Sequence, residues 1–354
     1  MRLASQGLEP RSDSDPASIT RHLGAIQAQE VRSAALALFV RGTAVTGQGV
    51  RTALVEDRSI VRTWAMRRTL HIVPTEDLPW LLPLLASRLL PRVSARLEQL
   101  GVDENLCERA VGMISALLGQ HGPLTRAEIV HELGERDLDA SGQLAPWLLC
   151  RAALEGLICH GPEKDRTASF VLLQDWVRES VPARRSLSSD QALAELAGRY
   201  LASHQPASPA DFSAWSGLPI RDARAGWNLL GSRLSNVFVN GRTMSVLSAS
   251  PARPLLARTP VVRLLPRFDP YLLGYRDRSM MVDQRKAKLI NAGGGMPKPT
   301  IMVDGRITGT WRYRFGRTSE IHLDPFSPLA DAVLPGLHLE VQAVESFLDE
   351  LASE

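Results

Sequence analysis

The sequence contains no run of about 18 or more apolar residues, the length that a membrane-spanning helix needs. Its N-terminus, MRLASQGLEPRSDSDP, also lacks the apolar stretch of a secretory signal peptide. These two absences predict a cytoplasmic protein without a membrane partner.

Cysteine is scarce, and histidine shows no metal-binding spacing. Cys107, Cys150 and Cys159 are an odd number of thiols and lie far apart, which argues against a disulfide framework and against a metal-ligand pattern. The eight histidines contain no HExxH or HxxxH pairing. We therefore expect buried free thiols, no metal and no cofactor.

Lysine is nearly missing. Of the 41 basic side chains four are lysine, at positions 164, 286, 288 and 298, and 37 are arginine, while the net charge is only +3. A GC-rich genome explains such a bias, but arginine is also the better residue for forked contacts to phosphate or guanine. Composition alone does not decide between these two explanations.

A repeated arrangement is the most informative feature that is present. Residues 106–175 predict three helices, the second of which begins with a Thr125–Glu128 capping box, followed by a two-stranded hairpin. Residues 188–248 repeat this order, and Asn240-Gly241 marks the turn of their hairpin. Three helices and a two-stranded wing are the order of a winged helix.

The N-terminal region fits the same order less closely. Asp15-Pro16 is typical of a helix start, and helices are predicted at about 16–26, 31–41 and 46–58. The stretch TWAMRRTLHIV is predicted to be a strand. A helix over 76–98 holds three prolines, so it should be broken or kinked.

The C-terminal region differs, because short β segments and a final helix replace the helical repeat. A basic, glycine-rich stretch that includes residues 276–288 lies between the β segments, and it is either a DNA-contacting hairpin or an ordinary solvated loop. We predict a mainly α fold with β, in which three winged helices precede a small β-barrel. The predicted domains span 1–100, 101–180, 181–255 and 256–354.

Tandem winged helices favour duplex DNA as the partner, although such domains also dock proteins. Five stretches carry a resemblance to a known family: RLASQGL near the start, LGAIQAQ at 23–29, EDRSIVRTWAMRRTLHIVPTEDLPWL at 56–81, LLPRFDPYLLGYRDR at 264–278 and TIMVDGRITGTWR at 300–312. In these stretches the chain resembles the AlkZ-like winged-helix DNA glycosylases.

The resemblance implies three winged helices and a β-barrel curved around DNA. The family's Gln–aliphatic–Gln catalytic motif falls on Gln27, Ala28 and Gln29. With a glutamine, Gln29, at the second polar position, the motif is similar to that of the subgroup that acts on bulky adducts. Family wings read Met-Arg-Gly-Thr, whereas Arg68 stands here in place of the glycine, which adds a charge and leaves the local contacts open.

Two amides suit one kind of hydrolysis. A purine alkylated at N7 is already cationic and leaves as a neutral base, so the enzyme needs mainly to position a water, which glutamine amides can do. Residues two apart share a face only in an extended segment, so residues 27–29 must leave the helix if both amides are to hold one water. Glu30 is a rival base, although it is also typical of a helix start.

The chain is thus expected to be a monofunctional DNA glycosylase that releases bulky N7- or N3-alkylated purines. Unhooking of interstrand crosslinks, as self-resistance to a genotoxic natural product, is a further expectation. A non-catalytic winged-helix regulator of transcription is the alternative. The partner would be double-stranded DNA carrying alkylated purines, bound by a monomer. Catalysis is assigned to Gln27 and Gln29, and DNA binding to nine basic residues: Arg62, Arg67, Arg68, His71, Arg276, Arg278, Arg285, Lys286 and Lys288.

Overall fold

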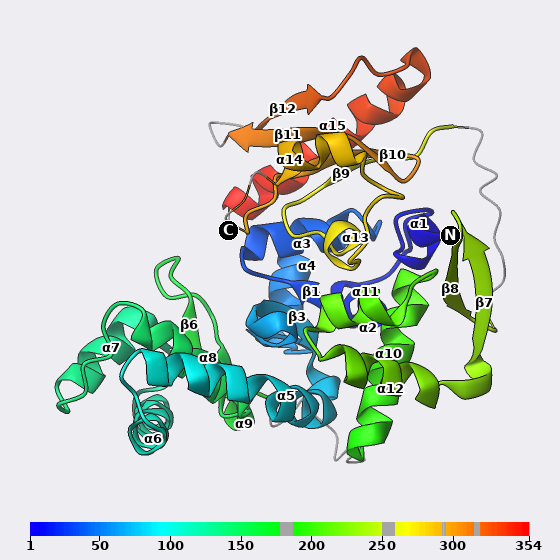
Figure 1. The fold of residues 1–354 in the computed structure, drawn as a ribbon. Coiled ribbons are helices and arrows are strands. Elements are labelled where there is room, and N and C mark those ends of the chain that lie inside the picture. Colours follow the sequence, from blue (N-terminus) through cyan, green and yellow to red (C-terminus); the bar gives the residue numbers. More distant parts are fainter. Residues whose placement is uncertain (178–186, 250–258, 292, 294, 315–318, 354) are drawn as a thin grey trace.

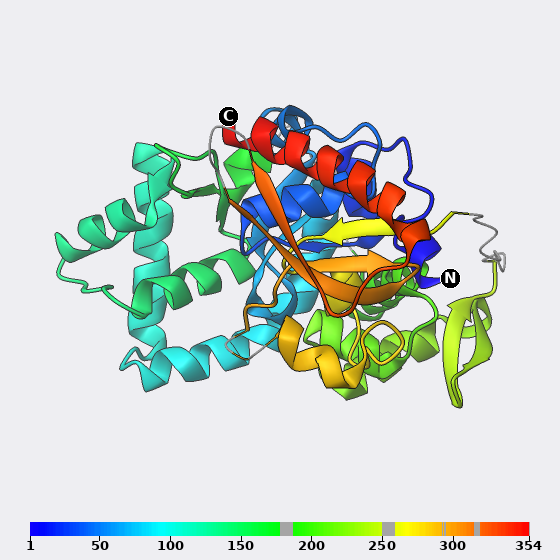
Figure 2. The ribbon, with the colours of Figure 1, turned by 90° about the horizontal axis from the view of Figure 1, so that it is seen from above.

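The structure is a computed structural model that describes residues 1–177, 187–249, 259–291, 293, 295–314 and 319–353. It contains three units of similar element order, followed by an antiparallel sheet and a long helix (Figure 1). Seen from above in Figure 2, the second unit extends to one side, and the C-terminal sheet and helix lie across the first unit. All three cysteines are buried and free, as predicted.

The first unit combines helices with a three-stranded sheet. Its strand β1 lies between helices α2 and α3 in the chain and pairs with β3, which gives the sheet order β1-β3-β2. The first helix ends three residues earlier than predicted, because Gly24 adopts a φ of 77° and the chain then enters β1. The elements are α2 (Pro16–Leu23), β1 (Ile26–Gln27), α3 (Val31–Phe39), α4 (Gly47–Arg51), its π-helical continuation η1 (Thr52–Glu56), β2 (Ile60–Trp64) and β3 (Leu70–Pro74).

The second unit repeats this topology, with the sheet order β4-β6-β5. The predicted capping box is present, since the Thr125 hydroxyl accepts from the Glu128 amide and the Glu128 carboxylate accepts from the Thr125 amide. The elements are α6 (Glu104–His121), β4 (Leu124–Thr125), α7 (Arg126–Gly134), α8 (Leu144–Leu154), β5 (Ile158–His160), β6 (Ser169–Leu172) and α9 (Leu173–Val177).

The third unit has the same order with a shortened first strand. Ala207 takes the place of that strand and exchanges two backbone hydrogen bonds, of 2.8 and 3.1 Å, with Ser245. Asn240 and Gly241 form the hairpin turn, as predicted, with φ angles of 49° and 77°. The elements are α10 (Ser189–His204), α11 (Pro209–Ser216), α12 (Ile220–Leu229), β7 (Leu234–Val239) and β8 (Arg242–Leu247).

Two segments differ from what the sequence suggested. The stretch 63–73 is not one strand, because β2 and β3 form a hairpin whose turn contains η2 (Met66–Arg68). The predicted break in the proline-rich helix is also missing, since α5 (Leu78–Gln99) is continuous through Pro83 and Pro91. Burial of its leucine-rich face offsets the backbone hydrogen bonds that the prolines remove.

The C-terminal strands form an open four-stranded antiparallel sheet of order β12-β11-β10-β9, and no closed barrel is found in the described part of the chain. The barrel prediction is therefore corrected to a sheet, because four strands are too few to enclose a core and α15 packs against β9 and β12 instead. The elements are β9 (Val262–Leu265), α13 (Pro270–Leu273), α14 (Ala287–Ile290), β10 (Thr300–Val303), β11 (Arg306–Arg314), β12 (Glu320–Pro325) and α15 (Leu334–Ser353).

A buried ion pair joins the first unit to the C-terminal segment. Arg41 and Asp269 form two hydrogen bonds of 2.8 Å, and both side chains are almost fully buried. Asp269 also accepts from the amide of Tyr271 at the start of α13, so its role is structural. The domain limits at 180/181 and 255/256 lie outside the described residues, and the other limits stay predictions.

Candidate active site

The Gln27–Ala28–Gln29 motif begins on the edge strand β1 of the first unit and continues into the bend before α3. Ile26 and Ala28 are fully buried, and the Ala28 amide donates to the Leu70 carbonyl at 2.7 Å. The alternate positions face away from the core, so Gln27 is half-buried and Gln29 is exposed. Residues 27–29 have left the helix, as the sharing of one water by two amides requires.

Arg67 fixes the orientation of the Gln27 amide. One terminal guanidinium nitrogen of Arg67 donates to the Gln27 side-chain oxygen at 2.6 Å, and the other donates to the Trp215 carbonyl on α11. A guanidinium only donates, so the Gln27 oxygen must face Arg67 and the amide NH₂ must face away. Burial, and secondly the nearby Arg278, lower the pKa of Arg67 to about 10, so the side chain is charged at neutral pH.

The turn that carries Arg67 has an unusual backbone. Arg67 and Arg68 both have positive φ angles, of 56° and 60°. They are not on a regular strand, because the turn η2 interrupts the predicted one. Gly217 supports the turn closely, because an added Cβ there would lie 2.8 Å from the Arg67 backbone nitrogen. The third unit therefore holds the turn beside the motif.

Arg62 and His71, on the neighbouring strands β2 and β3, contact or adjoin the motif. The Arg62 side chain donates to the Ala28 carbonyl at 3.0 Å, and burial lowers its pKa to about 10. His71 pairs with Gln27 across the sheet and is only 1% exposed, so its predicted contact with DNA does not fit its position. Burial, followed by the charge of Arg67, lowers the pKa of His71 to about 3, which makes it a weak base.

The rival base Glu30 is engaged by neighbouring side chains. One of its carboxylate oxygens accepts from Arg267 at 3.2 Å, and the other accepts from the Ser33 hydroxyl at 3.0 Å. Glu30 precedes α3 as its N-cap residue, as the sequence suggested. These contacts favour a structural role for this carboxylate.

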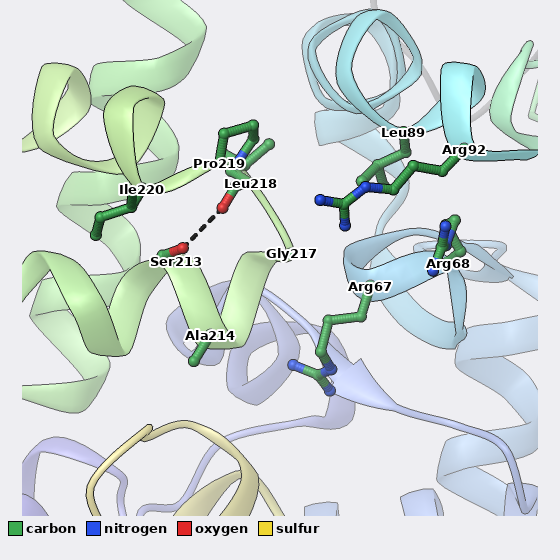
Figure 3. A pocket seen from close by; sticks show the side chains of 10 residues that line it. All are labelled: Arg67, Arg68, Leu89, Arg92, Ser213, Ala214, Gly217, Leu218, Pro219 and Ile220. Atoms are coloured by element: carbon green, nitrogen blue, oxygen red, sulfur yellow. Dashed lines mark hydrogen bonds between the residues drawn. The ribbon is translucent and has the colours of Figure 1, made fainter.

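A cavity of about 400 Å³ adjoins the Arg67–Arg68 turn (Figure 3). It lies between this turn, helix α5 and the link from α11 to α12. Its lining residues are Arg67, Arg68, Leu89, Arg92, Ser213, Ala214, Gly217, Leu218, Pro219 and Ile220. Arg92 and residues Gly217–Ile220 could not be assigned to the site from the sequence, because a position on α5 and a loop more than 100 residues away carry no local sign of proximity.

The other predicted basic residues divide into two groups. Arg278 lies near Arg67, as the electrostatic effect on that side chain indicates, and its Nε is buried with no hydrogen-bond partner. Residues 276–288 form turns and short helices, so the predicted hairpin is corrected. Arg285 pairs with Asp283 at 2.8 Å, Lys286 lies over the Phe326 ring, and Arg276 and Lys288 are exposed.

Two searches were negative. Among the described residues, no three histidine, cysteine or carboxylate side chains gather as metal ligands. Within the same residues, no helix is long and apolar enough to cross a membrane.

The site combines uncharged amides with an excess of guanidinium groups, and the repeated helical units present it on one molecule. Such a site holds a polyanion by charge and polarises a water by hydrogen bonds. Comparison with known proteins identifies the class as DNA glycosylases. The chain belongs to the family described as DNA glycosylase AlkZ-like, whose model matches residues 20–347. This enzymatic family decides against the non-catalytic regulator.

Individual relatives agree with this assignment. The chain is 30% identical over 340 residues to an "Interstrand DNA cross-link repair glycosylase" of Streptomyces sahachiroi, an alignment that covers 88% of this chain and 85% of the relative. The solved structure of the Streptomyces sahachiroi DNA glycosylase AlkZ superposes with a TM-score of 0.81, covering 97% of this chain and 93% of that one at 24% sequence identity. The second comparison concerns the fold.

Proposed function

We propose that this DNA glycosylase hydrolyses the N-glycosidic bond of bulky N7- or N3-alkylated purines in duplex DNA, with Gln27 and Gln29 positioning the attacking water. The observation that carries the proposal is the position of the motif at the end of β1, outside any helix, where Ala28 is buried, Gln27 is half-buried and Gln29 is exposed while Arg67 holds the Gln27 oxygen. Interstrand crosslinks are the proposed natural lesion, because the curated relative is named for their repair.

The chemistry divides between lesion and protein. When the bond between the sugar carbon and the cationic base breaks, the electron pair neutralises the base, which leaves without being protonated. Water then supplies the new C–O bond, and its proton passes to solvent. The protein needs to place the water and stabilise positive charge on the sugar, which uncharged amides do without a general base.

The two amides would divide the work. The oxygen of Gln27 is bound to Arg67, so Gln27 offers its NH₂ group as a donor to the water oxygen. Gln29 is exposed and hydrogen-bonded to no other side chain in the described residues, so its oxygen is free to accept the water proton. In this arrangement Gln27 orients the water and Gln29 polarises it.

The lesion would be reached from the groove, with a large adduct left outside the protein. The cavity near the motif supports this route, because three arginines and no aromatic side chain line it, whereas many pockets for a flipped base stack the base on aromatic side chains. Self-resistance to a genotoxic natural product, action as a monomer and a cytoplasmic location stay predictions.

Excision assays on defined DNA test the proposed function. Duplexes carrying N7-methylguanine or a bulky N7 adduct are incubated with the protein, and alkali-labile abasic sites are counted under single-turnover conditions. Gln27→Ala and Gln29→Ala should each reduce the rate about 100-fold, since water positioning supplies about 3 kcal/mol.

Glu30→Gln is the matched control, because it removes the neighbouring carboxylate and leaves both amides in place. It should keep most of the activity. A double glutamine variant that excises the lesion at the wild-type rate would move the chemistry elsewhere. A large loss with Glu30→Gln alone would assign it to the carboxylate.

A further inference from the structure

The cavity beside the motif carries positive charge without matching negative charge. Three arginines line it, and its lining includes no carboxylate. Within the described residues, Arg68 and Arg92 have neither an ion pair nor a side-chain hydrogen bond, whereas Arg88, one turn before Arg92 on α5, is paired with Asp222 at 2.8 Å. Unpaired guanidinium groups that line one cavity favour an anionic ligand there.

The three arginines differ in what they are free to do (Figure 3). Arg67 turns its guanidinium away from the cavity towards β1, where Gln27 and Trp215 occupy both terminal nitrogens. Arg92 extends from α5 into the cavity, and Arg68 lies beside it on the turn. Arg68 and Arg92 are thus available to a ligand, while Arg67 connects their cavity to the motif.

Arg68 occupies its position at an energetic cost. Its φ of 60° lies in the left-handed region, where a side chain is disfavoured by about 1 kcal/mol and glycine is not. The turn would therefore form more easily with glycine at this position. A strained arginine at the rim of a cavity is typical of a residue held for binding.

We propose that this cavity seats a backbone phosphate of the DNA strand, next to the nucleotide that Gln27 and Gln29 attack. Arg68 and Arg92 form charge-assisted hydrogen bonds to its oxygens, and the wall of Leu218, Pro219 and Ile220 packs against the adjoining sugar. The inference rests on the proposed function in taking the motif as the point of attack. It assigns a seat for one phosphate, which fixes the register of the strand relative to the two amides.

The choice of a phosphate follows from the chemistry of the lining. A phosphodiester presents two charged oxygens to forked donors, and it accompanies every nucleotide whatever its base. The apolar part of a bulky adduct would have to share the cavity with two unpaired guanidinium groups, which lose hydration without gaining a partner. That occupant is therefore an outcome of the test.

A methylphosphonate scan tests the seat directly. Duplexes with a stable tetrahydrofuran abasic analogue in place of the lesion carry one neutral methylphosphonate at each position in turn, and their affinities are compared for wild type and for the Arg68→Gly, Arg92→Ala double variant. In wild type, one or two neighbouring substitutions should weaken binding about tenfold, as expected for the loss of a charge-assisted contact.

The double variant should be insensitive at those positions alone, and its salt slope of binding should fall by roughly 0.9 per lost phosphate contact. Arg224→Ala is the matched control, since Arg224 is exposed on α12 and does not line the cavity. It should keep the wild-type pattern of sensitivity. The double variant should fold, because glycine adopts the positive φ at position 68 without strain.

Three results would overturn the phosphate seat. The first is a double variant that remains sensitive to methylphosphonate at the same positions as wild type. The second is equal sensitivity of wild type at every position. The third is a double variant that binds abasic DNA normally and loses only the excision of bulky adducts. The last result would place the adduct in the cavity. The methylphosphonate scan measures binding only and no bond is cleaved in it. The excision assays on the glutamine variants can therefore support or contradict the proposed function without deciding whether the phosphate seat exists.

Discussion

At the residue scale, the central contact joins Arg67 to the Gln27 oxygen at 2.6 Å. An isolated Gln-x-Gln sequence carries almost no chemical information, because glutamine is frequent on surfaces and at helix ends. The resemblance to a family identified the motif, and the periodicity of strands predicted that residues 27–29 must be extended. The sequence did not reveal the partner of Gln27, since 40 residues separate it from Arg67.

Arg67 should therefore act as a positioning residue. Arg67→Ala should lower the single-turnover excision rate about 10- to 100-fold, because the Gln27 amide loses a charged hydrogen-bond partner. Arg67→Lys should restore only part of the rate, since one ammonium group does not span two carbonyl oxygens in the geometry of a guanidinium.

Rates are compared with dissociation constants for the same DNA. A purely electrostatic role would weaken DNA binding, and Arg67→Lys would then recover it in full. A positioning role lowers the rate at saturating enzyme in both variants. Equal recovery of rate and affinity by lysine would contradict the assignment.

At the element scale, most helices and hairpins of the three repeated units could be predicted from the sequence. Apolar periodicity, the Thr125–Glu128 capping box and the Asn240-Gly241 turn are local signals, and each corresponds to an element in the structure. The segments that were predicted incorrectly owe their conformation to contacts with residues far away in the sequence. The turn at Met66–Arg68 lies against Gly217 of the third unit, so its positive φ angles could not be predicted from its own residues.

Gly217→Ala tests the contact between these two units. Its Cβ would lie 2.8 Å from the Arg67 nitrogen and 2.9 Å from the Arg67 Cα, so the turn and the Gln27 contact must shift. We expect excision to fall about tenfold or more, an effect of about 1.4 kcal/mol, while DNA binding by the other units persists.

Gly241→Ala is the matched control. Gly241 has the same φ of 77° but no atom within 4 Å of an added Cβ. Gly241→Ala should lose about 1 kcal/mol of stability from backbone strain alone and keep its activity. Gly217→Ala should lose more stability, because the contact with the Arg67 backbone adds to the same strain, and it should also lose activity. Equal activity of the two variants would show that the turn does not depend on this contact.

At the scale of the whole molecule, buried ionisable groups tie the parts together and set the pH range of the fold. Arg41 and Asp269 join the first unit to the C-terminal segment, and neither partner could be matched from sequence, where 228 residues separate them. The closed barrel was wrongly predicted for a similar reason. Alternating apolar strands indicate a sheet but do not show whether a helix covers it or the strands close on themselves.

The fold should lose stability in mild acid. Burial lowers the pKa of His71 and of His204 to about 3, so both are neutral in the native state. An unfolded chain takes up these protons near the ordinary pKa of about 6.5. The stability they contribute is thus present above pH 6.5 and declines as the pH falls towards 3, by about 1.4 kcal/mol per unit for each histidine.

Urea unfolding between about pH 6.5 and pH 5 measures this slope, in a window above the ordinary carboxylate pKa values. His204→Gln should remove about one proton from the slope. His131→Gln changes an exposed histidine on α7 and should leave the slope unchanged. An identical slope for wild type and His204→Gln would contradict the assignment of a neutral buried imidazole.

The most direct measurement compares two lesions of the same shape and different charge. One duplex carries a cationic N7-alkylguanine, and the other carries the 7-deaza analogue with the same alkyl group, which is neutral. If the lesion supplies the leaving-group activation and the amides only hold water, the protein binds both but excises only the cationic base in single-turnover assays. Excision of the neutral analogue at a comparable rate would show that the protein supplies an acid, and would contradict this account.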